Sequence, residues 1–254
     1  MSILAQVTSN RRGAPRATII FGVGGCGKST FAAGAPSPIF LPCEAGINDI
    51  EVPAVPFLDS YPAVMEAITA LYQEEHQYQT VVVDSLDWLE RLIWDDVASA
   101  EKVDSIEGIG YGKGYTFALD RWRTLLSGLN ALRKDRGMHA VCLAHSQIEK
   151  FEDPGSASYD RYSIKLHKKA AGLVVEWADE VLFARSKVVV KVEDEGFNKK
   201  RGRGIGGDDR VLCTTERPSH YAKNRLGMPQ EIPLTLEGGW NEYAQYFTTT
   251  REES

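Results

Sequence analysis

The chain has 254 residues, of which 43% are hydrophobic and 25% charged, the composition of an ordinary globular protein with enough length for a sizeable core. Its 29 Lys and Arg against 35 Asp and Glu give a net charge of −6. That balance disfavours a protein that binds nucleic acid over its whole surface and leaves only local basic patches for such a contact. No apolar run approaches the ~18 residues of a membrane-spanning helix.

The N-terminus and the cysteines bear on the compartment. Met1–Arg16 lack the apolar stretch of a signal peptide, so we expect a cytoplasmic location and no membrane partner. The cysteines stand far apart without a C-x-x-C pair, which fits neither a zinc site nor a disulfide framework and predicts reduced, mostly buried thiols.

Short apolar runs alternate with helical stretches along the chain, which is typical of an α/β protein with a mainly parallel central sheet flanked by helices. Strands are predicted at Ala17–Phe21, Ile39–Cys43, Thr80–Asp84, His139–Ala144, Glu180–Ala184, Lys187–Glu193 and Arg210–Thr215, the last two forming a C-terminal β-hairpin. Helices are predicted from about Lys28, through Met65–Tyr72, over 86–97 and 119–132, and over Ile164–Trp177. Glu149–Ser163 is polar and is predicted to be a mobile loop. We expect one domain over 16–247, with an N-terminal arm (1–15) and a flexible tail (248–254).

A glycine-rich segment between the first strand and the first helix matches the phosphate-loop pattern G-x-x-x-x-G-K-[ST] at every position. In this context the backbone N–H groups at the helix start face phosphates, Lys28 reaches the β- and γ-phosphates, and the Ser29 hydroxyl ligates Mg²⁺. The alternative is a strand–helix turn that binds nothing. The predicted nucleotide-binding residues are Gly22, Gly24, Gly25, Cys26, Gly27, Lys28, Ser29 and Thr30.

Asp84 ends the apolar run TVVVD, a Walker B pattern in which the carboxylate helps to hold Mg²⁺. Alone, an acid after an apolar run is usually a turn residue, but downstream of a phosphate loop it indicates a metal ligand. We therefore expect ATP and Mg²⁺ as cofactors, with Ser29 and Asp84 as the metal-binding residues.

Polar residues follow two other predicted strands, at the sheet edge where open α/β sheets bind ligands. Glu44 follows the second strand, and His145, Ser146 and Gln147 end the fourth. Hydrolysis of ATP needs a carboxylate that orients water and a group that senses the γ-phosphate. The alternatives are a solvated loop acid for Glu44 and a turn cap for the polar trio.

In order and spacing, five segments resemble the RecA/RadA-type recombinase core, and most closely the core-only RecA-like ATP-binding proteins of bacteriophages, the Sak-type annealing-associated ATPases. The segments are GVGGCGKST, IFLPCEAG, VVVDS, LAHSQI and HYAKNRLGMP, and YDRYSIKLHKKAAGLVVEWADEVLF is also similar to the phage group. The resemblance spans about Arg16 to Leu236. A phage protein of this kind would act in the cytoplasm of an infected bacterium.

The resemblance implies roles for individual residues. Glu44 corresponds to the glutamate that activates water, and Gln147 to the glutamine that couples the γ-phosphate to a DNA loop, while the phage proteins resemble one another more at His145. Lys223 and Arg225 resemble the pair that reaches the neighbouring subunit's γ-phosphate, which implies a ring or filament. The alternative for this pair is an exposed basic turn.

RecA-like proteins contact single-stranded DNA through two loops, which correspond here to Asp104–Tyr115 and Ile148–Leu166. Cations interleaved with flat rings suit single strands, because cations neutralise phosphates and rings stack on unpaired bases. The hairpin tip Asn198–Gly204 is a third basic candidate, and each segment has a solvated loop as its alternative. The candidate contact residues are Lys113, Tyr115, Arg161, Lys165, Lys168, Lys169, Lys199, Lys200, Arg201 and Arg203.

The sequence thus predicts a RecA-like ATPase that assembles and assists recombination or single-strand annealing, with a single-strand-binding protein or another recombination or replication protein as a further partner. The chain lacks the separate DNA-binding domain of full-length RecA, so independent strand exchange is not expected. Two rivals remain. One is a P-loop phosphotransferase acting on a small substrate, and the other is an ATP-dependent adaptor that loads another protein without binding DNA itself.

Overall fold

The structure is a computed structural model, which describes residues 14–46, 50–153, 155, 157–194, 200–235 and 239–247. Within 188–194 and 200–208 it describes the backbone course alone. The expectations for the arm up to residue 13, the tail 248–254 and Lys199 therefore lie outside the described residues.

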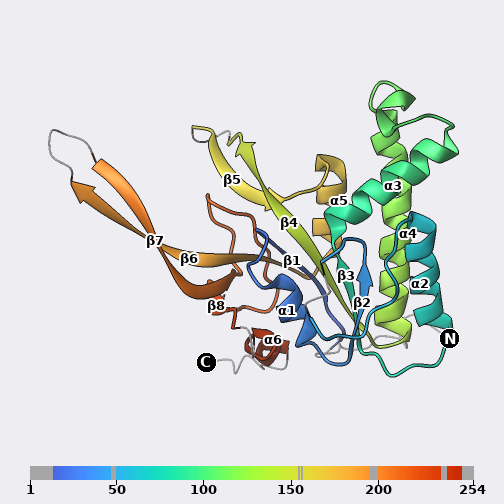
Figure 1. Ribbon diagram of the computed structural model, residues 1–254, viewed down its shortest axis with the longest axis horizontal. Coiled ribbons are helices and arrows are strands. Elements are labelled where there is room, and N and C mark those ends of the chain that lie inside the picture. Colours follow the sequence, from blue (N-terminus) through green and yellow to red (C-terminus); the bar gives the residue numbers. More distant parts are fainter. Residues whose placement is uncertain are drawn as a thin grey trace, which may run out of the picture.

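An eight-stranded sheet forms the centre of the molecule, in the order β2-β3-β4-β1-β6-β7-β8, with β5 paired to β4 outside this path (Figure 1). The pairs from β2 to β6 are parallel, whereas β7 and β8 are added antiparallel, which confirms the mainly parallel α/β class and the C-terminal hairpin. The strands are β1 (Ala17–Gly22), β2 (Pro38–Pro42), β3 (Thr80–Asp84), β4 (His139–Phe151), β5 (Tyr159–Ile164), β6 (Glu180–Asp194), β7 (Lys200–Cys213) and β8 (Glu231–Pro233).

Helices cover both faces of the sheet, because its buried strands alternate apolar side chains between two cores. Ile19 and Phe21 of β1 pack with α2 to α5 on one face, and Ile20 packs with α1 and α6 on the other. Figure 1 shows α2, α3 and α4 side by side. The helices are α1 (Lys28–Ala33), α2 (Tyr61–Gln73), α3 (Leu86–Ala100), α4 (Lys113–Asp135), α5 (Lys168–Trp177) and α6 (Gly239–Ala244), with 3-10 turns at Ile106–Ile109 and Gln245–Phe247.

The prediction of a mobile loop over Glu149–Ser163 is wrong. β4 continues to Phe151 and pairs antiparallel with β5, so that Gln147 lies opposite Ser163 and Glu149 opposite Arg161. The guanidinium of Arg161 lies 3.9 Å from the centre of the Phe151 ring and pairs with Glu149 at 3.3 Å. These cross-strand contacts stabilise a hairpin whose polar sequence lacks the apolar alternation that identifies a strand.

Three other boundaries differ from the predictions. α5 begins at Lys168 rather than Ile164, because Ile164 ends β5. The two strands expected over 180–193 are a single strand, β6, with an irregular register between Ser186 and Val188. Lys113 and Tyr115, expected in a loop, lie in the first turn of α4.

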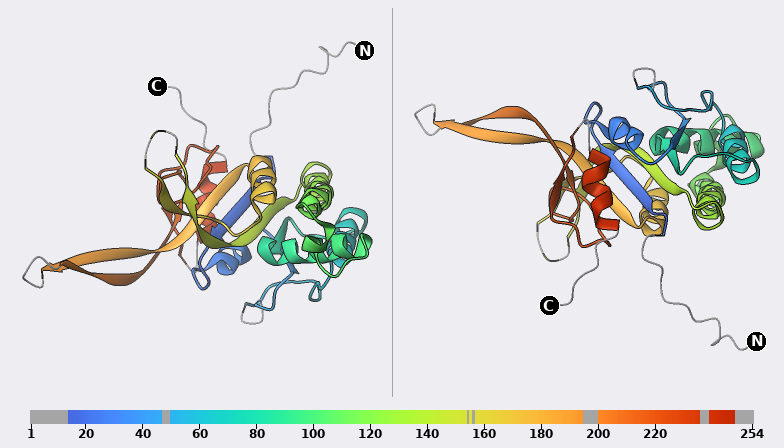
Figure 2. Two further views of the ribbon diagram at one scale, coloured as in Figure 1. Left: turned by 90° about the horizontal axis from the view of Figure 1, so that it is seen from above. Right: turned by 90° about the horizontal axis from the view of Figure 1, so that it is seen from below.

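β6 and β7 continue beyond the body of the molecule as a two-stranded ribbon, seen from two further directions in Figure 2. All four cysteines are buried and free, as predicted. Among the described residues, no helix is long and apolar enough to cross a membrane.

Candidate functional site

A cavity of about 280 Å³ opens at the carboxyl edge of the sheet, where β1, β2 and β3 end beside His145 of β4. The structure brings most of the predicted catalytic and phosphate-binding residues to its wall. It also places there one arginine that the sequence analysis did not identify. The lining residues are Gly24, Gly25, Gly27, Lys28, Ser29, Thr30, Glu44, Gly46, Ile50, Asp84, His145 and Arg210.

The phosphate loop depends on two glycines with different constraints. A Cβ on Gly22 would lie 2.3 Å from the carbonyl oxygen of Ala184 on β6, so no side chain fits there. Gly27 has a φ of +94° and directly precedes α1, in a backbone conformation that other residues rarely adopt. The buried Lys28 donates hydrogen bonds from Nζ to the carbonyl oxygens of Gly22 (3.2 Å) and Val23 (2.9 Å). The lysine is thereby held against the loop that it serves.

Ser29, in the first turn of α1 after β1, meets Asp84 at the end of β3, although β4 lies between β1 and β3. The Ser29 hydroxyl donates a hydrogen bond to Oδ2 of Asp84 at 2.9 Å. Burial raises the pKa of Asp84, while the Ser29 bond and the charge of Lys28 act against that rise. Among the described residues no three His, Cys, Asp or Glu side chains cluster as a metal site. This donor set suits Mg²⁺, which takes few protein oxygens together with waters and substrate phosphates.

His145 is held by a carboxylate that the sequence analysis missed. Asp87, in the first turn of α3, is only 5% exposed and accepts hydrogen bonds from the His145 backbone N–H (3.0 Å) and ring Nδ1 (3.1 Å). The Asp87 bond raises the pKa of His145 against the opposing effect of burial. Burial in turn would raise the pKa of Asp87, but the bonds from His145 prevail and lower it. The imidazole is therefore favoured in its charged form.

Glu44 lies beside this pair, with Oε2 3.9 Å from Nδ1 of His145. Burial raises the pKa of Glu44, and the His145 charge partly offsets that rise. A carboxylate next to a histidine at the wall of a phosphate-sized cavity is suited to orienting water and accepting its proton.

Gln147, the second sensor candidate, does not line this cavity. Its amide donates a hydrogen bond to the Ile164 carbonyl at 3.3 Å, and its side chain borders another cavity of about 260 Å³ between the β4–β5 hairpin and α5. His145 and Gln147 are two residues apart on β4 and border different cavities.

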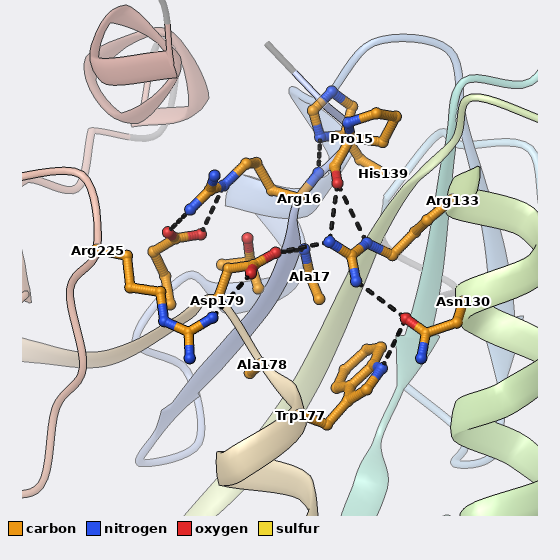
Figure 3. A network of polar contacts seen from close by, with 12 residues as sticks. Pro15, Arg16, Ala17, Asn130, Arg133, His139, Trp177, Ala178, Asp179 and Arg225 are labelled. Atoms are coloured by element: carbon orange, nitrogen blue, oxygen red, sulfur yellow. Dashed lines mark hydrogen bonds and ion pairs between the residues drawn. The ribbon is translucent and has the colours of Figure 1, made fainter. Parts of the chain in front are cut away.

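Lys223 and Arg225 lie at the opposite edge of the sheet from the phosphate loop. Nζ of Lys223 donates hydrogen bonds to carbonyls at the end of α5, including Val175 at 2.9 Å. Arg225, whose side chain is 56% exposed, pairs with Asp179 at 3.3 Å. Asp179 also accepts a hydrogen bond from the backbone N–H of Ala17, at the start of β1, so this network marks the amino edge (Figure 3). Neither cation contacts its own chain's phosphate cavity.

The end of the first segment proposed for single-stranded DNA lies beside the residues that directly follow the second. The Tyr115 ring stacks on His167 with ring centres 4.2 Å apart, and Nζ of Lys169 donates a hydrogen bond to Thr116 at 3.0 Å. Because one face of the Tyr115 ring is covered, the exposed aromatic side chain of this segment is Tyr111. Of the candidate contact residues with described side chains, those exposed are Lys113, Lys165, Lys168 and Lys169.

Two predicted contact regions fit DNA binding less directly. Arg161 is mostly buried, stacks on Phe151 and pairs with Glu149 and Glu216, so its charge is already engaged. Lys200, Arg201 and Arg203 lie on β7, of which only the backbone is described at these positions.

The AAA domain family matches residues 14–226, most of the chain. The crystal structure of the RadB recombinase superposes with a TM-score of 0.46 at 12% sequence identity, covering 89% of this chain and 90% of that chain. No curated protein matches the sequence. The matched range of the family includes the phosphate loop and every other lining residue of the cavity described above.

Proposed function

Because this chain belongs to the AAA domain family, we propose that it is a magnesium-dependent ATPase of the RecA-like class that assists DNA recombination or single-strand annealing. The observation that carries the proposal is the cavity in which the phosphate loop meets Asp84, Glu44 and His145. A phosphate loop alone serves any P-loop protein. A carboxylate beside a histidine at the phosphate site is suited to activating a water that attacks the γ-phosphate.

Each residue has a role in this reaction. Lys28 binds the β- and γ-phosphate oxygens, and Ser29 and Asp84 hold Mg²⁺. Bound Mg²⁺ neutralises charge on the phosphate oxygens. Glu44 orients the attacking water and accepts its proton, and His145, whose charged form the Asp87 bond favours, donates a hydrogen bond to the terminal phosphate.

His145 also offers a route from the nucleotide to the DNA-binding segments. Its carbonyl accepts a hydrogen bond from the Lys165 backbone N–H at 2.9 Å, and β4 runs directly from His145 into the β4–β5 hairpin. A change in the His145 position on phosphate release is therefore transmitted to Lys165, one of the exposed cations. Exposed lysines beside Tyr111 supply phosphate contacts and a stacking surface for an unpaired strand.

We also propose that the protein assembles, which the position of Lys223 and Arg225 supports. Since both lie at the amino edge, away from their own cavity, they serve the γ-phosphate of a neighbouring subunit in a ring or filament. We propose a Sak-type phage ATPase of this kind, working with a single-strand-binding or other recombination protein in the host cytoplasm.

The test is ATP hydrolysis with and without single-stranded DNA, combined with the mass of the protein in solution. Hydrolysis that DNA stimulates, by an assembled species, supports the proposal. Transfer of the γ-phosphate to a small acceptor molecule instead of to water supports the phosphotransferase. Hydrolysis without salt-dependent DNA binding supports the adaptor.

A further inference from the structure

We propose that Arg210 binds the terminal phosphate of the nucleotide in its own subunit, as an essential cation of the phosphate cavity in addition to Lys28 and His145. This inference rests on the proposed ATPase function. Arg210 belongs to none of the sequence motifs, because it lies on β7, more than 180 residues after the phosphate loop. Its side chain nevertheless lines the same cavity as Gly24, Gly25 and Lys28.

Strand register explains how β7 reaches the loop. Gly22 at the end of β1 pairs with Ala184 of β6, and Ala184 pairs with Leu212 of β7. Arg210, opposite Ser186, is two residues further along the ribbon, which is the level of Gly24. The sheet therefore places Arg210 beside the first half of the phosphate loop.

The backbone at Arg210 is fixed on both sides. β7 is hydrogen-bonded between β6 and β8, and the Leu234 N–H donates a hydrogen bond to the Arg210 carbonyl at 2.9 Å. The next residue, Val211, is buried in the core. A cation anchored on a sheet is positioned more accurately than one on a loop.

The Arg210 side chain is half-buried, and no hydrogen bond or ion pair to another described residue engages its guanidinium. Its neighbour Arg185, by contrast, pairs with Glu231 at 2.7 Å. The charge of Arg210 is near enough to the loop to oppose the rise in the pKa of Cys26 that burial causes. The guanidinium is thus available to the cavity.

The charges around the cavity explain why a further cation is needed there. The cavity wall carries two carboxylates, Glu44 and Asp84, while His145 is paired with Asp87 and the ammonium of Lys28 is shared with two loop carbonyls. A nucleoside triphosphate adds further negative charge, which in the transition state is spread over the oxygens of the transferring γ-phosphoryl group and of the leaving group. The planar guanidinium binds phosphate oxygens in a bidentate manner and so stabilises this charge.

The experiment compares Arg210→Ala, Arg210→Lys and Arg217→Ala, an exposed arginine outside the cavity that serves as the control. Arg210→Ala is expected to lower kcat ~10²–10³-fold and to keep ADP binding. The variant should also fail to form a stable complex with ADP and aluminium fluoride, which mimics the γ-phosphoryl group in the transition state. Added guanidinium ion is expected to restore part of the hydrolysis lost in Arg210→Ala. Arg210→Lys is expected to retain part of the parent's hydrolysis, and Arg217→Ala should hydrolyse ATP as the parent does.

Parent-like hydrolysis and trapping by Arg210→Ala would overturn the proposal, and so would a loss of ADP binding in a variant with a parent-like circular dichroism spectrum. Mixing Arg210→Ala with Lys28→Ala subunits tests the cis assignment. No rescue is expected, because each site then lacks one of its own cations, whereas rescue would place Arg210 in a neighbour's site. If the parent protein itself does not hydrolyse ATP, the proposed function fails. The binding measurements with ADP and aluminium fluoride still test whether Arg210 binds the terminal phosphate.

Discussion

Replacing Asp87 with Asn removes the charge that holds His145 and nearly preserves the shape of the side chain. In the parent, one carboxylate accepts two hydrogen bonds from His145, at 3.0 Å from the backbone and 3.1 Å from the ring. Asn retains an acceptor for the backbone bond, so the ring bond is the one lost. A hydrogen bond to a charged group contributes ~1.5–3 kcal/mol, which is the expected loss in the free energy of unfolding at about pH 6.

The loss should depend on pH in a definite direction. The pKa of His145 is raised above its ordinary value of 6.5 in the folded state, chiefly by the Asp87 bond. The stabilisation from that shift is fully present below 6.5 and disappears as the pH rises through the folded pKa. Once the pH is above the folded pKa, only a bond from a neutral ring remains, and the difference between parent and variant should fall to ~1 kcal/mol or less.

Urea unfolding of both proteins, followed by circular dichroism at about pH 6 and pH 9, measures the two differences. The control is Asp96→Asn, because Asp96 pairs with Arg121 at 2.7 Å and arginine stays charged at both pH values. If the loss of unfolding free energy in Asp87→Asn is the same at both pH values, as expected for the control, the charged His145–Asp87 pair is refuted.

Three other substitutions test catalysis, assembly and the core. Glu44→Gln should keep ATP binding, measured with a fluorescent analogue, and slow hydrolysis ~10²–10⁴-fold; lost binding would make Glu44 structural. Arg225→Ala mixed with Lys28→Ala should regain hydrolysis, because mixed interfaces contain one intact site, whereas activity that is merely additive would contradict shared sites. Burial raises the pKa of Glu90 to about 7, so the folded chain loses stability as the pH rises from 4.5 through that value. In urea, the free energy of unfolding of Glu90→Gln should exceed that of the parent by ~3 kcal/mol above about pH 8 and equal it near pH 4. Unfolding curves of variant and parent that coincide at both pH values would contradict this account.

The phosphate loop and Asp84 could be predicted because their chemistry is local. The glycines at fixed offsets, the lysine and the serine lie within eight consecutive residues between a strand and a helix, and the strand Thr80–Asp84 has the predicted bounds. The strands before the loop and at Asp84 are apolar runs, the strongest pattern that a buried parallel strand produces.

Asp87 and Arg210 could not be found in this way, because their roles depend on which strands become neighbours. Asp87 resembles any acid in the first turn of a helix until β4 brings His145 beside it. Arg210 reaches the phosphate loop only through two strand pairings, β1 with β6 and β6 with β7. The β4–β5 hairpin escaped prediction because it is held by cross-strand ion pairs and ring contacts rather than by an apolar face.

Release of phosphate from ATP in the presence of Mg²⁺, by the parent and by Lys28→Ala at equal concentration, tests the central claim most directly. The parent is expected to hydrolyse ATP. Lys28→Ala is expected to show none, because the loop loses the ammonium held at Gly22 and Val23. Circular dichroism spectra that coincide would show that both chains are folded. Equal rates of hydrolysis in the two proteins, or none in the parent with and without single-stranded DNA, would contradict the assignment of this cavity as an ATPase site.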